Sequence, residues 1–164
     1  MDIKILTTGG TIGGLEYENI DNRSEEKSVN ISSFLKSANP SFQYKIVDVF
    51  NKDSRFINED DRKMIAEKIT SSPEEKILIT HGTYTMPETA VYLGKRNFNK
   101  TIVLVGSFIL GSEVNTDAPF NLGYAIAALQ LLNPGVYIAM NGKIFNWNNV
   151  TKNITTNRFE EPNE

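Results

Sequence analysis

The chain has no cysteine and only one histidine among its 164 residues. The absence of cysteine excludes a disulfide framework and a thiolate metal site, and a single histidine excludes a metal site built from several histidines. A site made only of carboxylates is not excluded by this argument, although we expect no bound metal. Basic residues are not in excess either, since 17 lysines and arginines face 20 aspartates and glutamates. The net charge of −3 argues against a nucleic-acid partner, which requires a basic surface.

Long apolar runs are missing as well. The N-terminal stretch "MDIKILTTGG" has too few consecutive apolar residues for a signal peptide or a membrane span. We therefore expect no membrane contact and a cytoplasmic location. A chain of 164 residues has the size of one domain and can bury roughly two thirds of the surface of its unfolded state.

Five short apolar runs rich in β-branched residues are present. Runs this short and continuous are typical of strands buried on both faces of a sheet. Helical patterns lie between them, and strands that alternate with helices predict an α/β fold with a single parallel sheet, flavodoxin-like or Rossmann-like, covered by helices on both faces. The five runs are Ile3–Leu6, Tyr44–Phe50, Lys76–Thr80, Ile102–Val105 and Val136–Met140.

The helical patterns carry start signals and one clear apolar face. Asn58 precedes three acidic residues and is placed to cap a helix. Thr85 and Glu88 have the spacing of a capping box, and Pro87 falls in the first turn. A further helix is predicted by apolar residues at positions i, i+3, i+4 and i+7, namely Leu122, Ala125, Ile126 and Leu129.

Two polar segments do not follow this alternation. Residues Gly14–Asn30 show no apolar period and many charges, which fits either a solvated loop or a lid over a site. The segment from Thr155 is polar, and we expect it to be frayed or packed on a partner chain. We therefore predict one α/β domain over residues 1–154 and a polar C-terminal tail over residues 155–164.

Two turns rich in threonine and glycine follow predicted strands: "TTGGTIGG" at 7–14 and "THGTYTMPETA" at 80–90. Ligands of parallel α/β sheets bind at the carboxyl ends of the strands, where both turns fall. Neither turn has the G-x-G-x-x-G or G-x-x-x-x-G-K spacing of a phosphate cradle, so we expect no cofactor. Hydroxyls and bare backbone N–H groups suit acyl chemistry. The alternative that Thr11 and Thr83 only cap the following helices stays open.

Taken together, the motifs resemble those of the bacterial-type asparaginase family, T-G-G-T-I and H-G-T-D-T-M. The resemblance continues through "DS" at Asp53–Ser54, "VGSFILGSEVNTDAPFNL" from Val105 and "NGKIFNWNNVTKN" from Asn141. It covers nearly the whole chain, in order. The chain ends where the family's usual second domain begins, so it looks like a short, single-domain branch of that family.

The resemblance implies specific roles for residues of this chain. Thr11 corresponds to the nucleophile that attacks a side-chain amide and releases ammonia, and Thr83 to a second catalytic hydroxyl. Lys152 corresponds to the base toward Thr83, and Tyr17 to a tyrosine that orients the first threonine. Ser54 corresponds to the serine that holds the substrate carboxylate. The substrate-binding positions implied in this way are Gly10, Ser54, Arg55, Gly82, Tyr84 and Ser107.

Several positions depart from the family pattern. Tyr84 stands where the family has an aspartate, and a phenol is neutral at working pH. Arg55 stands where the family has glutamine or a similar neutral residue, and Gly106–Leu110 replace the motif G-A-M-R-P. We therefore expect the site to bind the ammonium of a free amino acid weakly, unless Asp117 or Glu113 supplies a carboxylate from another direction.

The resemblance leaves two functions to compare. The first is an amidohydrolase that acts on asparagine or a related small amide, with activity reduced or redirected by Tyr84 and Arg55. The second is a catalytically silent protein that binds a small amide or acid. Because family sites are completed by a neighbouring subunit, and because "GVYIAM" and "IFNW" supply aromatic residues suited to an interface, we expect a homodimer or a larger assembly.

Overall fold

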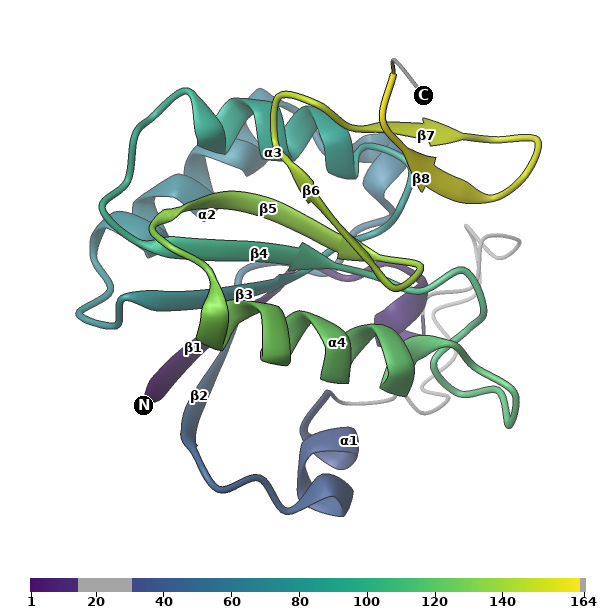
Figure 1. The fold of residues 1–164 in the computed structure, drawn as a ribbon, viewed down its shortest axis with the longest axis horizontal. Coiled ribbons are helices and arrows are strands. Elements are labelled where there is room, and N and C mark those ends of the chain that lie inside the picture. Colours follow the sequence, from purple (N-terminus) through teal and green to yellow (C-terminus); the bar gives the residue numbers. More distant parts are fainter. Residues whose placement is uncertain (15–30, 163–164) are drawn as a thin grey trace.

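The computed structural model describes residues 1–14 and 31–162 (Figure 1). Its helices and strands alternate along most of the chain. In order they are β1 (Asp2–Thr7), the 3-10 turn η1 (Thr11–Gly13), α1 (Ile31–Ala38), β2 (Gln43–Asp48), the 3-10 turn η2 (Ser54–Phe56), α2 (Glu59–Thr70), β3 (Lys76–Thr80), α3 (Met86–Gly94), β4 (Thr101–Val105), α4 (Ala118–Leu131), β5 (Gly135–Met140), β6 (Lys143–Asn146), β7 (Thr151–Asn153) and β8 (Arg158–Glu160).

The main sheet has the strand order β2-β1-β3-β4-β5-β6. The first five of these strands are parallel, as predicted, but β6 pairs antiparallel with β5. The prediction of a purely parallel sheet is therefore wrong at this edge. The cause is local: Met140 pairs with Lys143 across a two-residue Asn141-Gly142 turn, and both turn residues have positive φ (54° and 74°), as tight hairpins require.

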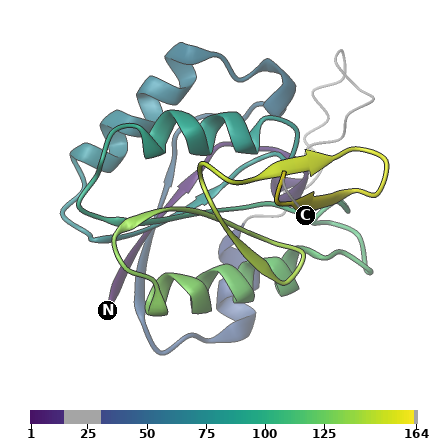
Figure 2. The same ribbon diagram turned by 45° about the horizontal axis from the view of Figure 1, so that its top comes forward.

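Helices cover both faces of the sheet, as the alternation of strands and helices predicted. α2 and α3 lie on one face and α4 on the other (Figures 1 and 2). The connections through these three helices all step in the same direction across the sheet. Because α4 lies on the opposite face, the β4–α4–β5 crossover has the opposite hand to the crossovers through α2 and α3. Such crossovers are right-handed in about 98% of cases, and we infer that this one is left-handed. The loop between β4 and α4 reaches η1, where Gly111 N donates to the Thr11 carbonyl oxygen at 3.0 Å.

Burial follows the predicted strands with one exception. All five residues of β4 are buried, as are four of the five in β3, because helices pack on both sides of these strands. β2 was expected to be buried on both faces, but it is the edge strand and none of its residues is fully buried. On α4, the predicted apolar face is confirmed for its three fully buried members, Leu122, Ala125 and Leu129.

One of the two predicted helix caps is confirmed. Asn58 and Asp61 form a reciprocal capping box at the start of α2, with distances of 3.1 Å and 3.0 Å. Thr85 occupies the N-cap position of α3, but its side chain makes no capping bond there. Its Oγ1 instead donates to the Ser54 carbonyl oxygen at 2.6 Å. The predicted capping box is therefore wrong, because Thr85 ties the start of α3 to η2.

The C-terminal segment forms a hairpin of β7 and β8 rather than a frayed tail. Phe159 is buried, and its ring centroid lies 6.1 Å from that of Phe108 and 6.4 Å from that of Phe145. The boundary predicted after residue 154 falls in the turn of this hairpin. The residues beyond it pack with the rest of the domain, since β8 contributes the Phe159 side chain to the core. Across 1–14 and 31–162, no helix is both long and apolar enough to cross a membrane.

Candidate active site

The two threonine-rich turns lie against each other at the carboxyl ends of β1 and β3. The strands are neighbours with Thr7 opposite Thr80, so the turns that follow start side by side. Gly10 has φ of 79°, and a Cβ at this position would come within 2.6 Å of Gly82 Cα and N. The close backbone approach therefore requires glycine at Gly10.

Neither candidate threonine occupies a helix-capping position. Thr11 is the first residue of η1, whose N-cap is Gly10, and Thr83 lies two residues before the N-cap of α3, which is Thr85. Both threonines are buried. Their positions therefore do not favour the alternative in which Thr11 and Thr83 only cap the following helices.

Thr83 meets Lys152, which is 69 residues away in sequence. Lys152 lies at the centre of β7, opposite Phe159 of β8, and its Nζ donates to Thr83 Oγ1 at 2.9 Å. The lysine side chain is partly buried, and this burial lowers the pKa of Lys152 because the charged form loses hydration. A lysine with a lowered pKa is more often neutral, and only the neutral amine can accept a proton from a hydroxyl.

Two aromatic rings lie beside the Lys152 amine. Nζ lies 4.2 Å from the ring centroid of Tyr84 and 5.3 Å from that of Phe108. Among the residues that the structure describes, no carboxylate forms an ion pair with Lys152. Tyr84 is 49% exposed, so its ring forms part of the surface beside the Thr83–Lys152 pair.

Ser54 and Arg55 reach the site from η2. Ser54 is fully buried, and its Oγ accepts from Tyr84 N at 3.2 Å. The guanidinium of Arg55 donates to Asp53 Oδ2 from Nε at 2.8 Å and from Nη2 at 2.6 Å. Its Cζ lies 5.8 Å from the Tyr84 ring centroid. The positive charge that the sequence placed at position 55 is thus paired with Asp53.

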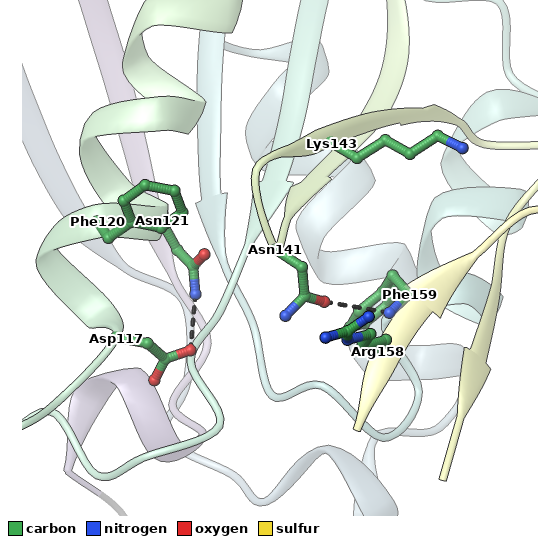
Figure 3. Close-up of a pocket in the computed structure, with 7 residues that line it drawn as sticks. All are labelled: Asp117, Phe120, Asn121, Asn141, Lys143, Arg158 and Phe159. Carbon is green, nitrogen blue, oxygen red and sulfur yellow. Dashed lines mark hydrogen bonds between the residues drawn. The ribbon is translucent and has the colours of Figure 1, made fainter. Parts of the chain in front are cut away.

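The loop after β4 uses its polar groups internally. Ser107 is buried, and its hydroxyl donates to the Ile109 carbonyl oxygen at 2.8 Å. Asp117 accepts from the backbone N–H groups of Phe108 and Ile109 and from Asn121 Nδ2 at 2.8 Å (Figure 3). The Asp117 carboxylate therefore holds the loop in place and forms no ion pair with Lys152.

His81 holds the second turn and was not predicted as a site residue. It is fully buried, and burial lowers its pKa to about 4, so the ring is neutral at neutral pH. Nδ1 lies 2.7 Å from the Gly82 carbonyl oxygen and must donate to it, so Nε2 accepts from Thr89 Oγ1 at 2.9 Å. Arg62 Nε donates to the same Thr89 oxygen at 3.1 Å. No signal in the sequence distinguishes this arrangement from a catalytic histidine.

A cleft of about 480 Å³ lies beside the β7–β8 hairpin (Figure 3). Its walls come from the start of α4, the β5–β6 turn and β8, with Asp117, Phe120, Asn121, Asn141, Lys143, Arg158 and Phe159 lining it. The described catalytic candidates Thr11, Thr83 and Lys152 are not among its lining residues. Among the described residues, no group of three or more histidine or acidic side chains could hold a metal ion.

Tyr17 lies outside the described residues, and so does most of the 14–30 segment that the sequence presented as a loop or a lid.

Comparisons with known proteins agree with the fold and the motifs. Residues 2–164 match the family described as "Asparaginase, N-terminal". The chain is 30% identical to the probable periplasmic L-asparaginase of Haemophilus influenzae, over 99% of this chain and 50% of that protein. The solved L-asparaginase of Thermococcus kodakarensis superposes with a TM-score of 0.86 at 29% identity, covering 100% of this chain and 52% of that one.

The structure of a probable cytoplasmic L-asparaginase from Campylobacter jejuni is also similar, with a TM-score of 0.82 and 30% identity over 98% of this chain and 52% of that one. The fold is thus that of an asparaginase-type α/β domain. The chain belongs to the asparaginase family. It spans about half the length of the relatives it matches.

Proposed function

We propose that the chain acts in an asparaginase-type amidohydrolase that converts a small amide, asparagine or a relative, into an acid and ammonia. The observation that carries this proposal is the 2.9 Å hydrogen bond between Lys152 Nζ and Thr83 Oγ1. It joins a potential base to a buried hydroxyl beside the turn that holds Thr11. A threonine hydroxyl is a weak nucleophile and needs such a base nearby.

In the proposed reaction Thr11 is the nucleophile. Its oxygen bonds to the amide carbon, and its proton is taken up by the neutral Lys152 amine. The C–N bond then breaks, and the nitrogen takes a proton and leaves as ammonia. Water attacks the resulting ester, which releases the acid and returns the proton to Thr11. Tyr17 is proposed to orient Thr11, and no cofactor takes part.

The proposed substrate contacts differ in what they can offer. Ser54 Oγ accepts a hydrogen bond from Tyr84 N, so its own proton is available for a substrate carboxylate. The Ser107 proton is donated to Ile109, so Ser107 can only accept from a ligand. Gly10 and Gly82 bring the two turns together. Arg55 attracts a substrate carboxylate less strongly than an unpaired arginine would, because its guanidinium already forms an ion pair with Asp53.

The second candidate is a catalytically silent protein that binds a small amide or acid. It is favoured by the aromatic surroundings of Lys152, where no described carboxylate serves as a counter-ion. A cytoplasmic location and an assembly of two or more copies are further parts of the proposal. Relatives with both periplasmic and cytoplasmic names exist, so location has to be measured.

The deciding experiment measures ammonia release over a panel of amides for the parent chain, Thr11→Val and Thr11→Ser. The amidohydrolase proposal expects release by the parent, none by the valine variant and partial release by the serine variant, which keeps the hydroxyl. Ligand-induced thermal shifts without ammonia release would support the silent binder instead. Activity retained in Thr11→Val would move the nucleophile to Thr83.

A further inference from the structure

Three segments that are far apart in the sequence enclose the Lys152 amine. The turn after β3 contributes the Thr83 hydroxyl at 2.9 Å and the Tyr84 ring at 4.2 Å. The loop after β4 contributes the Phe108 ring at 5.3 Å, and β7 carries Lys152 itself. A cation within about 6 Å of a ring centroid is attracted by the negative face of the ring.

Two acidic groups of the packed elements have other partners. On η2, Asp53 pairs with Arg55, and on the loop before α4, Asp117 accepts from backbone N–H groups. On β8, Arg158 and Glu160 flank Phe159, the residue opposite Lys152 in the hairpin. Burial lowers the pKa of Lys152, because the charged amine loses hydration. Within 1–14 and 31–162, the contacts that attract the ammonium are those with the Thr83 hydroxyl and the Tyr84 and Phe108 rings.

We propose that the face of the Tyr84 ring is the positioning group that holds Lys152 Nζ against the Thr83 hydroxyl, where a carboxylate counter-ion would otherwise do so. The geometry favours the ring face over the phenol, because the ring centroid itself lies 4.2 Å from Nζ and no hydrogen bond joins Nζ to the phenol oxygen. Arg55 lies farther from the same ring, at 5.8 Å, and is already paired.

The consequence concerns the charge state of the amine. A carboxylate beside an ammonium stabilises the charged form strongly, whereas an aromatic face stabilises it weakly. Lys152 held by a ring is therefore neutral at lower pH than a lysine paired with a carboxylate. If the proposed function is correct, on which this consequence for catalysis rests, the base toward Thr83 is available without a third, acidic member.

The test measures the pKa of Lys152 directly and needs no enzymatic activity. The protein is labelled with ¹³C-lysine, the Cε signal of Lys152 is identified by its loss in Lys152→Arg, and its shift is followed with pH. Tyr84→Phe keeps the ring face and removes the phenol oxygen, so its pKa should match the parent. Tyr84→Leu keeps an apolar group without the ring, so its pKa should fall by about half a unit to one unit.

Two further variants complete the series. Tyr84→Asp should raise the pKa of Lys152, because it supplies a counter-charge. Tyr84→Met repeats the leucine comparison if Tyr84→Leu does not fold, although the 49% exposure of Tyr84 argues that it will. A pKa in the leucine or methionine variant equal to or above that of the parent overturns the proposal. So does a fall in Tyr84→Phe as large as in Tyr84→Leu, because the phenol would then be the active group.

A second readout separates this proposal from the proposed function. If the chain hydrolyses an amide, the acidic limb of kcat/KM against pH should move in Tyr84→Leu in the same direction and by the same amount as the pKa measured by NMR. An NMR shift as expected, in a protein that releases no ammonia from any amide, would support the positioning role and reject the amidohydrolase.

Discussion

Replacing Tyr84 by aspartate should raise kcat/KM for asparagine by about ten- to hundredfold. The new carboxylate would supply a partner for a substrate ammonium, and we expect this gain in substrate binding to outweigh the loss of neutral Lys152 that a raised pKa brings. A hydrogen bond to a charged group contributes about 1.5–3 kcal/mol, and each 1.36 kcal/mol corresponds to a factor of ten in rate. Tyr84 is 49% exposed, so its loss should cost the fold little.

The assay compares two substrates that differ only in the ammonium. Ammonia release is measured from asparagine and from succinamic acid, which lacks the α-amino group, for the parent, Tyr84→Asp and the uncharged control Tyr84→Asn. The gain should appear with asparagine and Tyr84→Asp only. Equal gains for both substrates would refute the charge argument. So would a gain in Tyr84→Asn as large as the gain in Tyr84→Asp. Thermal melting must first show that each variant is folded.

Arg55 provides a secondary check of the same argument. Because Arg55 pairs with Asp53, adding Arg55→Gln to Tyr84→Asp both removes a cation and releases a carboxylate. Exposed ion pairs contribute up to about 1 kcal/mol, so the double variant should gain at most about fivefold more toward asparagine. A decrease would mean that Arg55 contacts the substrate carboxylate.

Three other predictions concern stability and assembly. Gly10→Ala should lower the free energy of unfolding by about 1–3 kcal/mol, because its Cβ would lie 2.6 Å from Gly82 and φ is 79°. The control Gly123→Ala, which has open space inside α4, should stabilise the protein slightly. Urea unfolding that ranks the two variants the other way would contradict the close-contact argument. His81 has a pKa of about 4 in the fold against 6.5 when unfolded, so the unfolded state binds more protons between these pH values. The free energy of unfolding should therefore fall as pH drops from about 6.5 to 4, by at most about 1 kcal/mol per pH unit. In urea melts, His81→Gln should flatten this pH dependence. Static light scattering at micromolar concentration should give the mass of at least two chains, and a stable monomer would reject the predicted assembly.

Local patterns in the sequence were enough to predict most of the framework. Five strands, β1 to β5, were predicted from short apolar runs. For β1, β3, β4 and β5 the reason is that residues buried between two helix layers are apolar at consecutive positions, whereas β2 lies at the exposed edge. The Asn58 cap was predictable because its partner is only three residues away. The placement of Thr11 and Thr83 followed from a general property of parallel sheets, whose carboxyl ends gather at one edge.

The contacts that define the candidate chemistry depended on the tertiary structure. Lys152 reaches Thr83 only because the β7–β8 hairpin, anchored by Phe159, returns across the end of the sheet. No periodicity or local motif encodes such an approach over 69 residues. The Tyr84 ring could be identified in the sequence as an unusual residue, but only packing decides that its face lies over the Lys152 amine.

Residues close together in the chain were therefore enough to define which segments are buried and where the hydroxyl-rich turns lie, since both depend on neighbouring residues. Charge pairing, such as that of Arg55 with Asp53, was decided by side-chain conformation, and the antiparallel β6 and the hand of the β4–α4–β5 crossover by how whole elements pack. These features follow from distances between groups in space, and composition and spacing along a chain do not specify those distances.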